Sequence, residues 1–233
     1  MICRHLNYMG KGIDNCVDIT IVYFCILRNP CRKGECRMQA QNPTKLLLSA
    51  TLKRMCASMQ LKNISVQKLV SECSLNRGTF YYHFKDIQDL VNWTYHTEIT
   101  IPTHEYIKNN TDPEPQISKL VLNKLFEDKA FYTQALAMGG QNNLYDFMLE
   151  ETKSNWACLC GRILNELKLP EQAVPDRIHV ALESAMTYYC YGHFFATQQW
   201  VKNDMNIPPD IFAHMLDTAA TKGLYSMVSE VIR

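Results

Sequence analysis

The sequence predicts an all-α protein in which an N-terminal three-helix helix-turn-helix unit precedes a larger helical C-terminal part. Two observations favour this class. Apolar residues recur at helical spacing from residue 43 to the C-terminus, and no strand-like alternation recurs after residue 38. Residues 64–90 combine two short helical patterns, a tight turn between them and the start of a third helix.

The formal net charge of +1 conceals an uneven distribution along the chain. Residues 38–85 carry a net charge of +6 and residues 1–37 carry +3, whereas the remainder carries −8. A basic N-terminal part, which we call the head, is attracted to nucleic-acid phosphates. An acidic C-terminal part, the body, is repelled by them. The charge pattern therefore favours a protein that binds a duplex through its head, with chance segregation of charge as the alternative.

Residues 1–37 do not follow the pattern of the rest. Their apolar run, residues 19–27, is too short to cross a bilayer, and no small-residue cleavage pattern follows it. The spacing Cys31-x4-Cys36 is not typical of a zinc site, so we expect no metal and a reducing compartment. We interpret residues 1–37 as a poorly ordered extension that need not belong to a native protein starting at Met38. A basic arm that adds phosphate contacts is the alternative.

The first expected helix begins at Pro43 and Thr44 and ends near Gln60. Its inner face is predicted from five residues, Leu46, Leu47, Thr51, Leu52 and Met55. Residues 61–63 connect it to a short helix with Ser65 as N-cap, because a serine hydroxyl accepts a hydrogen bond from a backbone N–H one turn on. The apolar face of this short helix is Val66, Leu69 and Val70.

A second short helix, residues 77–84, follows a turn at residues 73–75 and is expected to be capped by Asn76. It is rich in hydrogen-bond donors and contains no acidic residue, which suits the edges and backbone of a DNA groove. Asp86 is expected to cap the following helix, with Asp89 three residues on as a variant of the capping box.

The segment from Thr44 to Leu90 resembles the helix-turn-helix of the TetR/AcrR family of bacterial repressors. The resemblance is carried by the run LNRGTFYYHF, residues 75–84, which is similar to the family's recognition helix, and by the helix start at residues 85–90. Two positions depart from the family pattern. Ser74 occupies a turn position that is often glycine, and Ile87 a position that is often lysine, so one phosphate contact of the family is not expected.

Base reading is assigned to Arg77 and Tyr81, because an arginine can fork onto a guanine and a tyrosine ring can contact a thymine methyl. Gly78 allows the backbone to approach closely, and Gln67 resembles a family position that also reaches a base. The alternative to base reading for Tyr81 is a packing role within the helix-turn-helix unit. The predicted phosphate contacts, which position without specifying sequence, are Lys45, Ser65, Thr79, Tyr82, His83 and Lys85.

A long helix is expected from Asp86 until Pro102 kinks or ends it. In the family, this helix links the DNA-binding head to the body. Further helices are expected at residues 114–126, 128–138, 143–167 and 176–202 and from Pro208 to the C-terminus, with loops at 109–115 and 168–175 and a break at Gly139-Gly140.

Two features of the body point to binding. Aromatic, methionine and histidine side chains could line an apolar pocket for an effector, with ordinary core packing as the alternative. The candidates are Met148, Trp156, Met186, Tyr189, His193 and Phe194. The last two helices carry apolar residues on more than one face, which indicates a homodimer built as a four-helix bundle. The family resemblance implies the same arrangement.

The sequence thus predicts a DNA-binding domain at residues 38–92 and an effector-binding and dimerisation domain at residues 93–233. The resemblance implies a cytoplasmic, nucleoid-associated bacterial repressor that binds a near-palindromic operator as a homodimer, under the control of a small effector or a partner protein. The body also resembles regulators of dihydroxyacetone-kinase systems, which leaves an activator working with a partner protein as one alternative. A helical interaction module that does not bind DNA is another. We expect no cofactor, no membrane contact and no enzymatic activity, because no catalytic motif is present.

Overall fold

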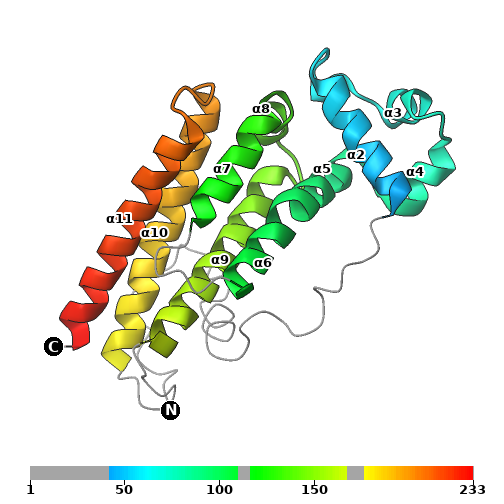
Figure 1. Cartoon of the computed structure of the whole chain (residues 1–233). Coiled ribbons are helices and arrows are strands. Elements are labelled where there is room, and N and C mark those ends of the chain that lie inside the picture. Colours follow the sequence, from blue (N-terminus) through cyan, green and yellow to red (C-terminus); the bar gives the residue numbers. More distant parts are fainter. Residues whose placement is uncertain (1–41, 110–115, 167–175, 233) are drawn as a thin grey trace, which may run out of the picture.

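The computed structural model describes residues 42–109, 116–166 and 176–232, and every regular element in these ranges is helical (Figure 1). The all-α prediction is therefore confirmed. The extension and the two loops expected at residues 1–37, 109–115 and 168–175 fall wholly or almost wholly outside the described residues. The elements are α2 (Pro43–Cys56), η1 (Leu61–Asn63), α3 (Val66–Glu72), α4 (Arg77–His83), α5 (Ile87–Tyr95), η2 (His96–Thr100), α6 (Ile101–Asn109), α7 (Ile117–Glu127), α8 (Lys129–Ala137), α9 (Leu144–Glu166), α10 (Asp176–Lys202) and α11 (Pro209–Ile232).

We call α2, α3 and α4 the head and the elements from α5 onward the body. The predicted inner face of α2 is wrong at Leu46 and Leu47, whose side chains are exposed. Leu48 is fully buried instead and continues along the face of Leu52. The buried face also includes Ser49, a polar residue whose hydroxyl accepts a hydrogen bond from Thr94 at 2.9 Å. The helix also ends at Cys56, four residues before the predicted end at Gln60.

The predicted caps of α3, α4 and α5 are confirmed. Ser65 accepts from the Lys68 N–H, Asn76 from the Thr79 N–H and Asp86 from the Asp89 N–H. The Asp89 carboxylate accepts in turn from the Lys85 N–H, one residue before the cap, so the reciprocal bond of the capping box is shifted by one residue. Ser74 has φ of 55°, a left-handed conformation that serine adopts at a modest cost.

The helix that links the head to the body does not end at Pro102. It continues from α5 through a π-helical turn, η2, into α6, and Pro102 is the second residue of α6. Proline lacks the N–H that would bond to the carbonyl four residues before it and collides with that carbonyl in a regular α-helix. The wider π turn immediately before Pro102, where the Ile101 N–H bonds to the His96 carbonyl, accommodates the ring.

The body consists of long helices stacked side by side (Figure 1). In this view α10 and α11 lie on the side away from the head, α7 packs against α11, and α9 lies between α10 and the α5–α6 helix. The interior is formed by fully buried side chains from several helices, including Leu122, Leu125, Phe131, Tyr132 and Leu144. The long helices α10 and α11 run alongside each other, and the head lies beyond the N-terminal end of α5 (Figure 1).

Side chains from distant parts of the sequence attach the head to the body. The Lys53 ammonium on α2 donates to the two Glu98 oxygens at 2.7 and 3.0 Å and to Asp128 Oδ2 at 2.9 Å. On α8, the Gln134 side chain accepts from the Leu61 backbone N–H at 2.6 Å and donates to the Cys56 carbonyl at 2.8 Å. The head is therefore held at both η2 and α8.

Candidate nucleic-acid interface and internal cavity

Helix α4 presents a polar outer face. Phe80 and Phe84 are buried in the head, whereas Tyr81 and Tyr82 are exposed, Tyr82 at 84%. The Arg77 guanidinium donates to the Tyr81 hydroxyl at 3.3 Å and lies 5.7 Å from the centre of its ring. The two predicted base-reading side chains are thus already paired one helical turn apart on the exposed side of α4.

Gly78 lies in the first turn of α4, and a Cβ there would come 3.1 Å from the Asn76 side-chain oxygen that caps the helix. The Thr79 hydroxyl donates to the same oxygen at 3.2 Å, so it is partly used within the cap. His83 is half-buried, with its ring 4.8 Å from that of Tyr82 in an edge-to-face arrangement. Because a Cβ at Gly78 would crowd the capping oxygen of Asn76, a substitution at Gly78 would disturb the N-terminus of α4. It would also hinder the close approach of the α4 backbone to DNA.

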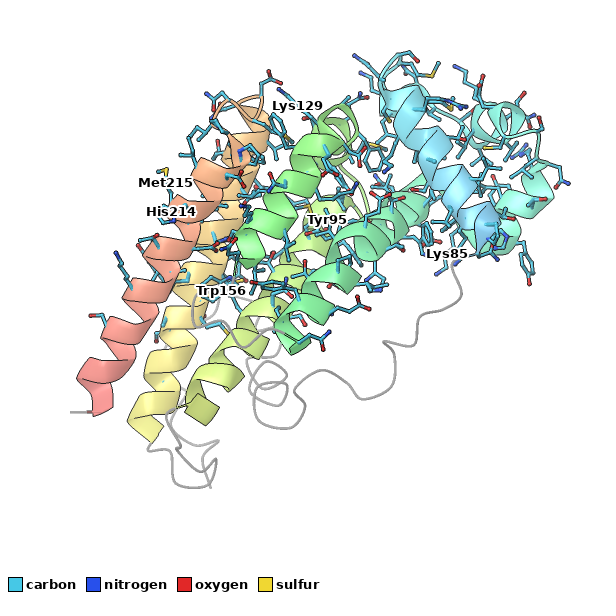
Figure 2. All side chains as sticks on the ribbon, viewed as in Figure 1. Lys85, Tyr95, Lys129, Trp156, His214 and Met215 are labelled. Atoms are coloured by element: carbon cyan, nitrogen blue, oxygen red, sulfur yellow. The ribbon has the colours of Figure 1, made fainter. Side chains whose placement is uncertain are left out.

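The remaining predicted DNA-contacting residues differ in their exposure and in whether their polar groups already make contacts within the chain. Gln67 and Lys85 are exposed, and Lys85 lies at the edge of the head in Figure 2. Ser65 is exposed as well, but its hydroxyl is the N-cap acceptor of α3. The Lys45 ammonium lies over the rings of Phe84 and Trp93, 5.2 and 5.6 Å from their centres. The structure places these residues on the head, and their contacts with DNA stay predictions.

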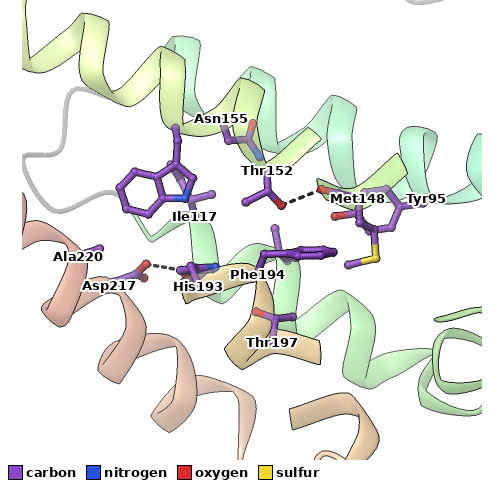
Figure 3. A pocket seen from close by; sticks show the side chains of 13 residues that line it. Tyr95, Ile117, Met148, Thr152, Asn155, His193, Phe194, Thr197, Asp217 and Ala220 are labelled. Atoms are coloured by element: carbon purple, nitrogen blue, oxygen red, sulfur yellow. Dashed lines mark hydrogen bonds between the residues drawn. The ribbon is translucent and has the colours of Figure 1, made fainter. Parts of the chain in front are cut away.

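The body contains a cavity of about 70 Å³ between α5, α7, α9, α10 and α11 (Figure 3). Four of the predicted pocket residues line it, namely Met148, Trp156, His193 and Phe194. Met186 and Tyr189 do not. Met186 is buried elsewhere, and Tyr189 stacks on the Trp156 ring at 5.9 Å and packs against Gly223. Apolar walls with a few polar groups are typical of a small-molecule site.

Three polar side chains from three helices form a chain of hydrogen bonds at the cavity. The Ser118 hydroxyl donates to Asp217 Oδ1 and lies 2.8 Å from His193 Nε2. Because the single Ser118 proton is used toward Asp217, the His193 Nε2–H must donate to Ser118. Burial lowers the pKa of His193 to about 4 and raises the pKa of Asp217 to about 6. His193 is therefore neutral at neutral pH.

This chain does not have the order of a nucleophilic triad. In such a triad the acid orients the histidine, and the histidine in turn takes the proton of the serine. Here the serine stands between the other two, and Ser118 is buried. Within the described ranges, no three His, Cys, Asp or Glu side chains gather closely enough to hold a metal ion. The three side chains therefore do not have the geometry of a nucleophilic triad.

The residues Tyr95, Ser118, Asn155, Thr197 and Asp217 also line the cavity and were not predicted. Ser118 and Asp217 could have been noticed, because each is a polar residue within an apolar helical pattern. Ser118 lies between Ile117 and Val121, and Asp217 follows Met215 and Leu216. Such residues in a helix are either interface groups or members of an internal site.

The pKa of Asp217 predicts how stability depends on pH. Burial raises this pKa from 3.8 to about 6, so between these values the folded chain holds the proton more tightly than the unfolded chain. The stability that Asp217 contributes is complete below pH 3.8 and is lost as pH rises through 6. The Asp217→Asn variant lacks this loss. Its unfolding free energy, minus that of the wild type, should increase by about 1 kcal/mol from pH 4 to pH 7.

Urea unfolding of both proteins at the two pH values measures this difference. The lowered pKa of His193 acts in the opposite sense, because its stability contribution is lost as pH falls from 6.5 to about 4. Both proteins retain His193, so the difference between them reports mainly on Asp217. A difference that is the same at pH 4 and pH 7 would show that Asp217 ionises as an exposed aspartate does.

A helix-turn-helix is a DNA-binding motif, and in this chain it is joined to a helical body with an internal cavity. Residues 112–222 match the family model TetR_C_8, described as a transcriptional regulator C-terminal region. The match covers most of the body and slightly less than half of the chain, and together with the head it supports a transcriptional regulator of the TetR type.

Among solved structures, the chain is similar to one titled dihydroxyacetone kinase operon activator DhaS, with a TM-score of 0.51 and 18% sequence identity. The similarity covers 81% of this chain and 96% of that one, and at this identity it shows the fold alone. No curated protein matches the chain. None of the described helices combines the length and apolar content needed to cross a membrane.

Proposed function

We propose that the protein binds a near-palindromic DNA duplex as a homodimer and represses transcription from it in the cytoplasm, at the nucleoid. The single observation that carries this proposal is the outer face of α4. It holds no acidic residue, and it presents the Arg77–Tyr81 pair beside exposed Tyr82. A short helix of this kind fits the major groove, where arginine reads guanine.

In this proposal Arg77, Tyr81 and Gln67 face bases, and Gly78 permits close approach. Residues 38–92 act as the DNA-binding domain and residues 93–233 as the effector-binding and dimerisation domain. The phosphate contacts are those predicted from the sequence, with two adjustments from the structure. Thr79 and Ser65 also serve as helix-capping groups, so their substitution would cost stability as well as binding. Lys45 would have to leave the rings of Phe84 and Trp93 to reach a phosphate.

The dimer is supported by an exposed apolar face on α10. Tyr188 and Phe195 are 72% and 60% exposed, and Tyr191 between them is half exposed. Their spacing of three and four residues places them on one side of the helix. On α11 Ile211 and Met215 are exposed, and Met215 points away from the body in Figure 2. Large apolar side chains gathered in this way favour a partner of the same kind.

The cavity is proposed as the effector site. Its walls include residues of α5, α7 and α10, and α5 continues into η2, where Glu98 contacts Lys53 of the head. A ligand that favours one arrangement of these helices can therefore shift the position of the head, and DNA favours the arrangement that fits its groove.

Base reading is tested with Arg77→Ala. This variant should bind the operator duplex about 1–3 kcal/mol more weakly while its affinity for random duplex changes much less. Lys85→Ala is the matched control, because loss of a phosphate contact should weaken both duplexes alike and lower the slope of log affinity against log salt by about one. Equal losses on both duplexes for Arg77→Ala would make Arg77 a phosphate contact. Binding that does not fall with salt would favour the interaction module that does not bind DNA.

A second candidate function is activation together with a partner protein. The observation that favours it is the solved structure of similar fold, which is titled an operon activator. Transcription from the operator in a purified system distinguishes the two. Repression predicts fewer transcripts when the protein alone is added. Activation predicts more transcripts, either with the protein alone or only after a partner is supplied.

A further inference from the structure

One oxygen atom at the cavity lacks a hydrogen-bond partner among the described residues. Thr197, on α10, lines the cavity and is 4% exposed, and its Oγ1 is buried without a partner (Figure 3). Buried polar groups in proteins almost always have partners, so this atom indicates that a molecule in the cavity supplies one.

The neighbouring polar groups have already used their protons within the protein. The Thr152 hydroxyl donates to the Met148 carbonyl at 2.8 Å, and the Ser118 hydroxyl donates to Asp217. They cannot donate to Thr197. A hydroxyl oxygen accepts as well as donates. A molecule in the cavity that carries a hydroxyl group would therefore satisfy Thr197 Oγ1.

The cavity disfavours an anionic ligand. None of the described residues that line it is a lysine or an arginine, so a carboxylate or phosphate would be buried near Asp217 without a counter-ion. Burial lowers the pKa of His193 to about 4, so this side chain does not supply a positive charge at neutral pH either. An uncharged ligand fits these observations.

Size and shape limit the ligand further. The volume of about 70 Å³ is roughly half of the ~150 Å³ cavity that holds benzene in another protein, so only a few non-hydrogen atoms fit without rearrangement. Phe194, Trp156, Met148 and Ile117 give the cavity aromatic and aliphatic walls. These walls suit a short carbon chain.

We propose that this cavity binds a small uncharged alcohol of about four carbon atoms, with its hydroxyl paired to Thr197 Oγ1 and its carbon chain against the aromatic wall. This inference rests on the proposed effector site and names the chemical class of its ligand. A hydroxyl fits Thr197 best because it can donate to Oγ1 or accept from it.

Four probes of nearly equal size test the proposal on the full chain without DNA. 1-Butanol and diethyl ether are isomers that differ in the hydroxyl donor, and butylammonium and butyrate add a charge of each sign. Binding is followed by the NMR signal of the Trp156 indole N–H, which is assigned with Trp156→Phe. We expect 1-butanol to bind at least about tenfold more tightly than the other three, since a factor of ten corresponds to one modest hydrogen-bond difference. Equal affinity for the ether, or tighter binding of either ion, overturns the proposal.

Thr197→Val removes the hydroxyl and keeps the shape of the side chain. In this variant 1-butanol should lose about tenfold in affinity and bind like diethyl ether. Thr133→Val on α8 is the matched control, because Thr133 also has a buried, unpartnered hydroxyl but does not line the cavity. It should bind 1-butanol as the wild type does. An unchanged preference in Thr197→Val rules out Thr197 as the recognising group, and the probe series on the wild type does not depend on either variant.

The result of the alcohol-binding experiment can be distinguished from the result of the DNA-binding experiment. Alcohol binding in a protein that fails to bind DNA in the salt titration would support this site and reject the regulator. DNA binding together with no preference for 1-butanol would reject this ligand class and leave the regulator in place.

Discussion

We expect Lys53→Met to lower the free energy of unfolding by about 2–3 kcal/mol, because it leaves two partly buried carboxylates without their main counter-ion. The Lys53 side chain is only 17% exposed, and its ammonium contacts Glu98 at 2.7 Å and Asp128 at 2.9 Å. Methionine preserves much of the length and apolar contact of the lysine stem. The loss therefore reports on the charge rather than on packing.

The expected loss is smaller than that for a fully buried pair because a second lysine remains. Lys124 lies 3.7 Å from Glu98 and 3.2 Å from Asp128, and hydrogen bonds and charges from Glu127, Glu98 and Asp128 raise its pKa despite the opposing effect of burial. After Lys53 is removed, this lysine can still offset part of the repulsion between the carboxylates. Replacing both lysines should cost more than the sum of the two single replacements, since each compensates for the other.

Urea unfolding of Lys53→Met beside Lys129→Met tests this expectation. Lys129 pairs with Asp204 at 2.8 Å, but Asp204 is 83% exposed, so the control should lose less than about 1 kcal/mol. Similar losses in the two variants would mean that the charge cluster at the head–body junction is no stronger than a surface pair. The variant should also weaken the response of DNA binding to a body ligand, because Lys53 joins α2 to η2.

The head was predictable because its determinants are local. Ser65, Asn76 and Asp86 each cap a helix by bonding to a backbone N–H three residues on, and the residue type and position suffice to predict that bond. The exposed α4 face followed from residue types within one short segment. The error on α2 had a local cause too, since Leu46, Leu47 and Leu48 are consecutive and the pattern does not distinguish which of them is buried.

The cavity and the junction were not predictable because they join residues far apart in the sequence. Ser118 and Asp217 are separated by 99 residues, and Lys53 and Asp128 by 75. Helical periodicity assigns each to a face of its own helix but does not give the rotation of that helix against its neighbours. His193 and Trp156 were predicted as pocket residues only because they carry aromatic rings. Tyr189 was predicted for the same reason, but it does not line the cavity.

We expect the second large effect from Phe195→Asp on α10. Phe195 is 60% exposed and lies on the same helix face as Tyr188 and Tyr191, so a buried charge at the proposed dimer interface would have no partner there. The variant should be a monomer in sedimentation or light-scattering measurements at micromolar concentration. Because one head then binds one half-site alone, its affinity for the full operator should fall roughly 10²–10⁴-fold.

The control for this change is Met59→Asp, which places the same charge at an exposed apolar residue of the turn after α2. It should remain a dimer. The folded content of Phe195→Asp should also remain, because an exposed side chain contributes little to the interior of its own chain. A Phe195→Asp protein that is still dimeric and binds the operator as the wild type does would show that the α10 face is not the interface. A monomer that binds single half-sites with unchanged affinity would separate the two roles cleanly, since α4 would then read DNA without help from the body and the dimer would supply only the second contact.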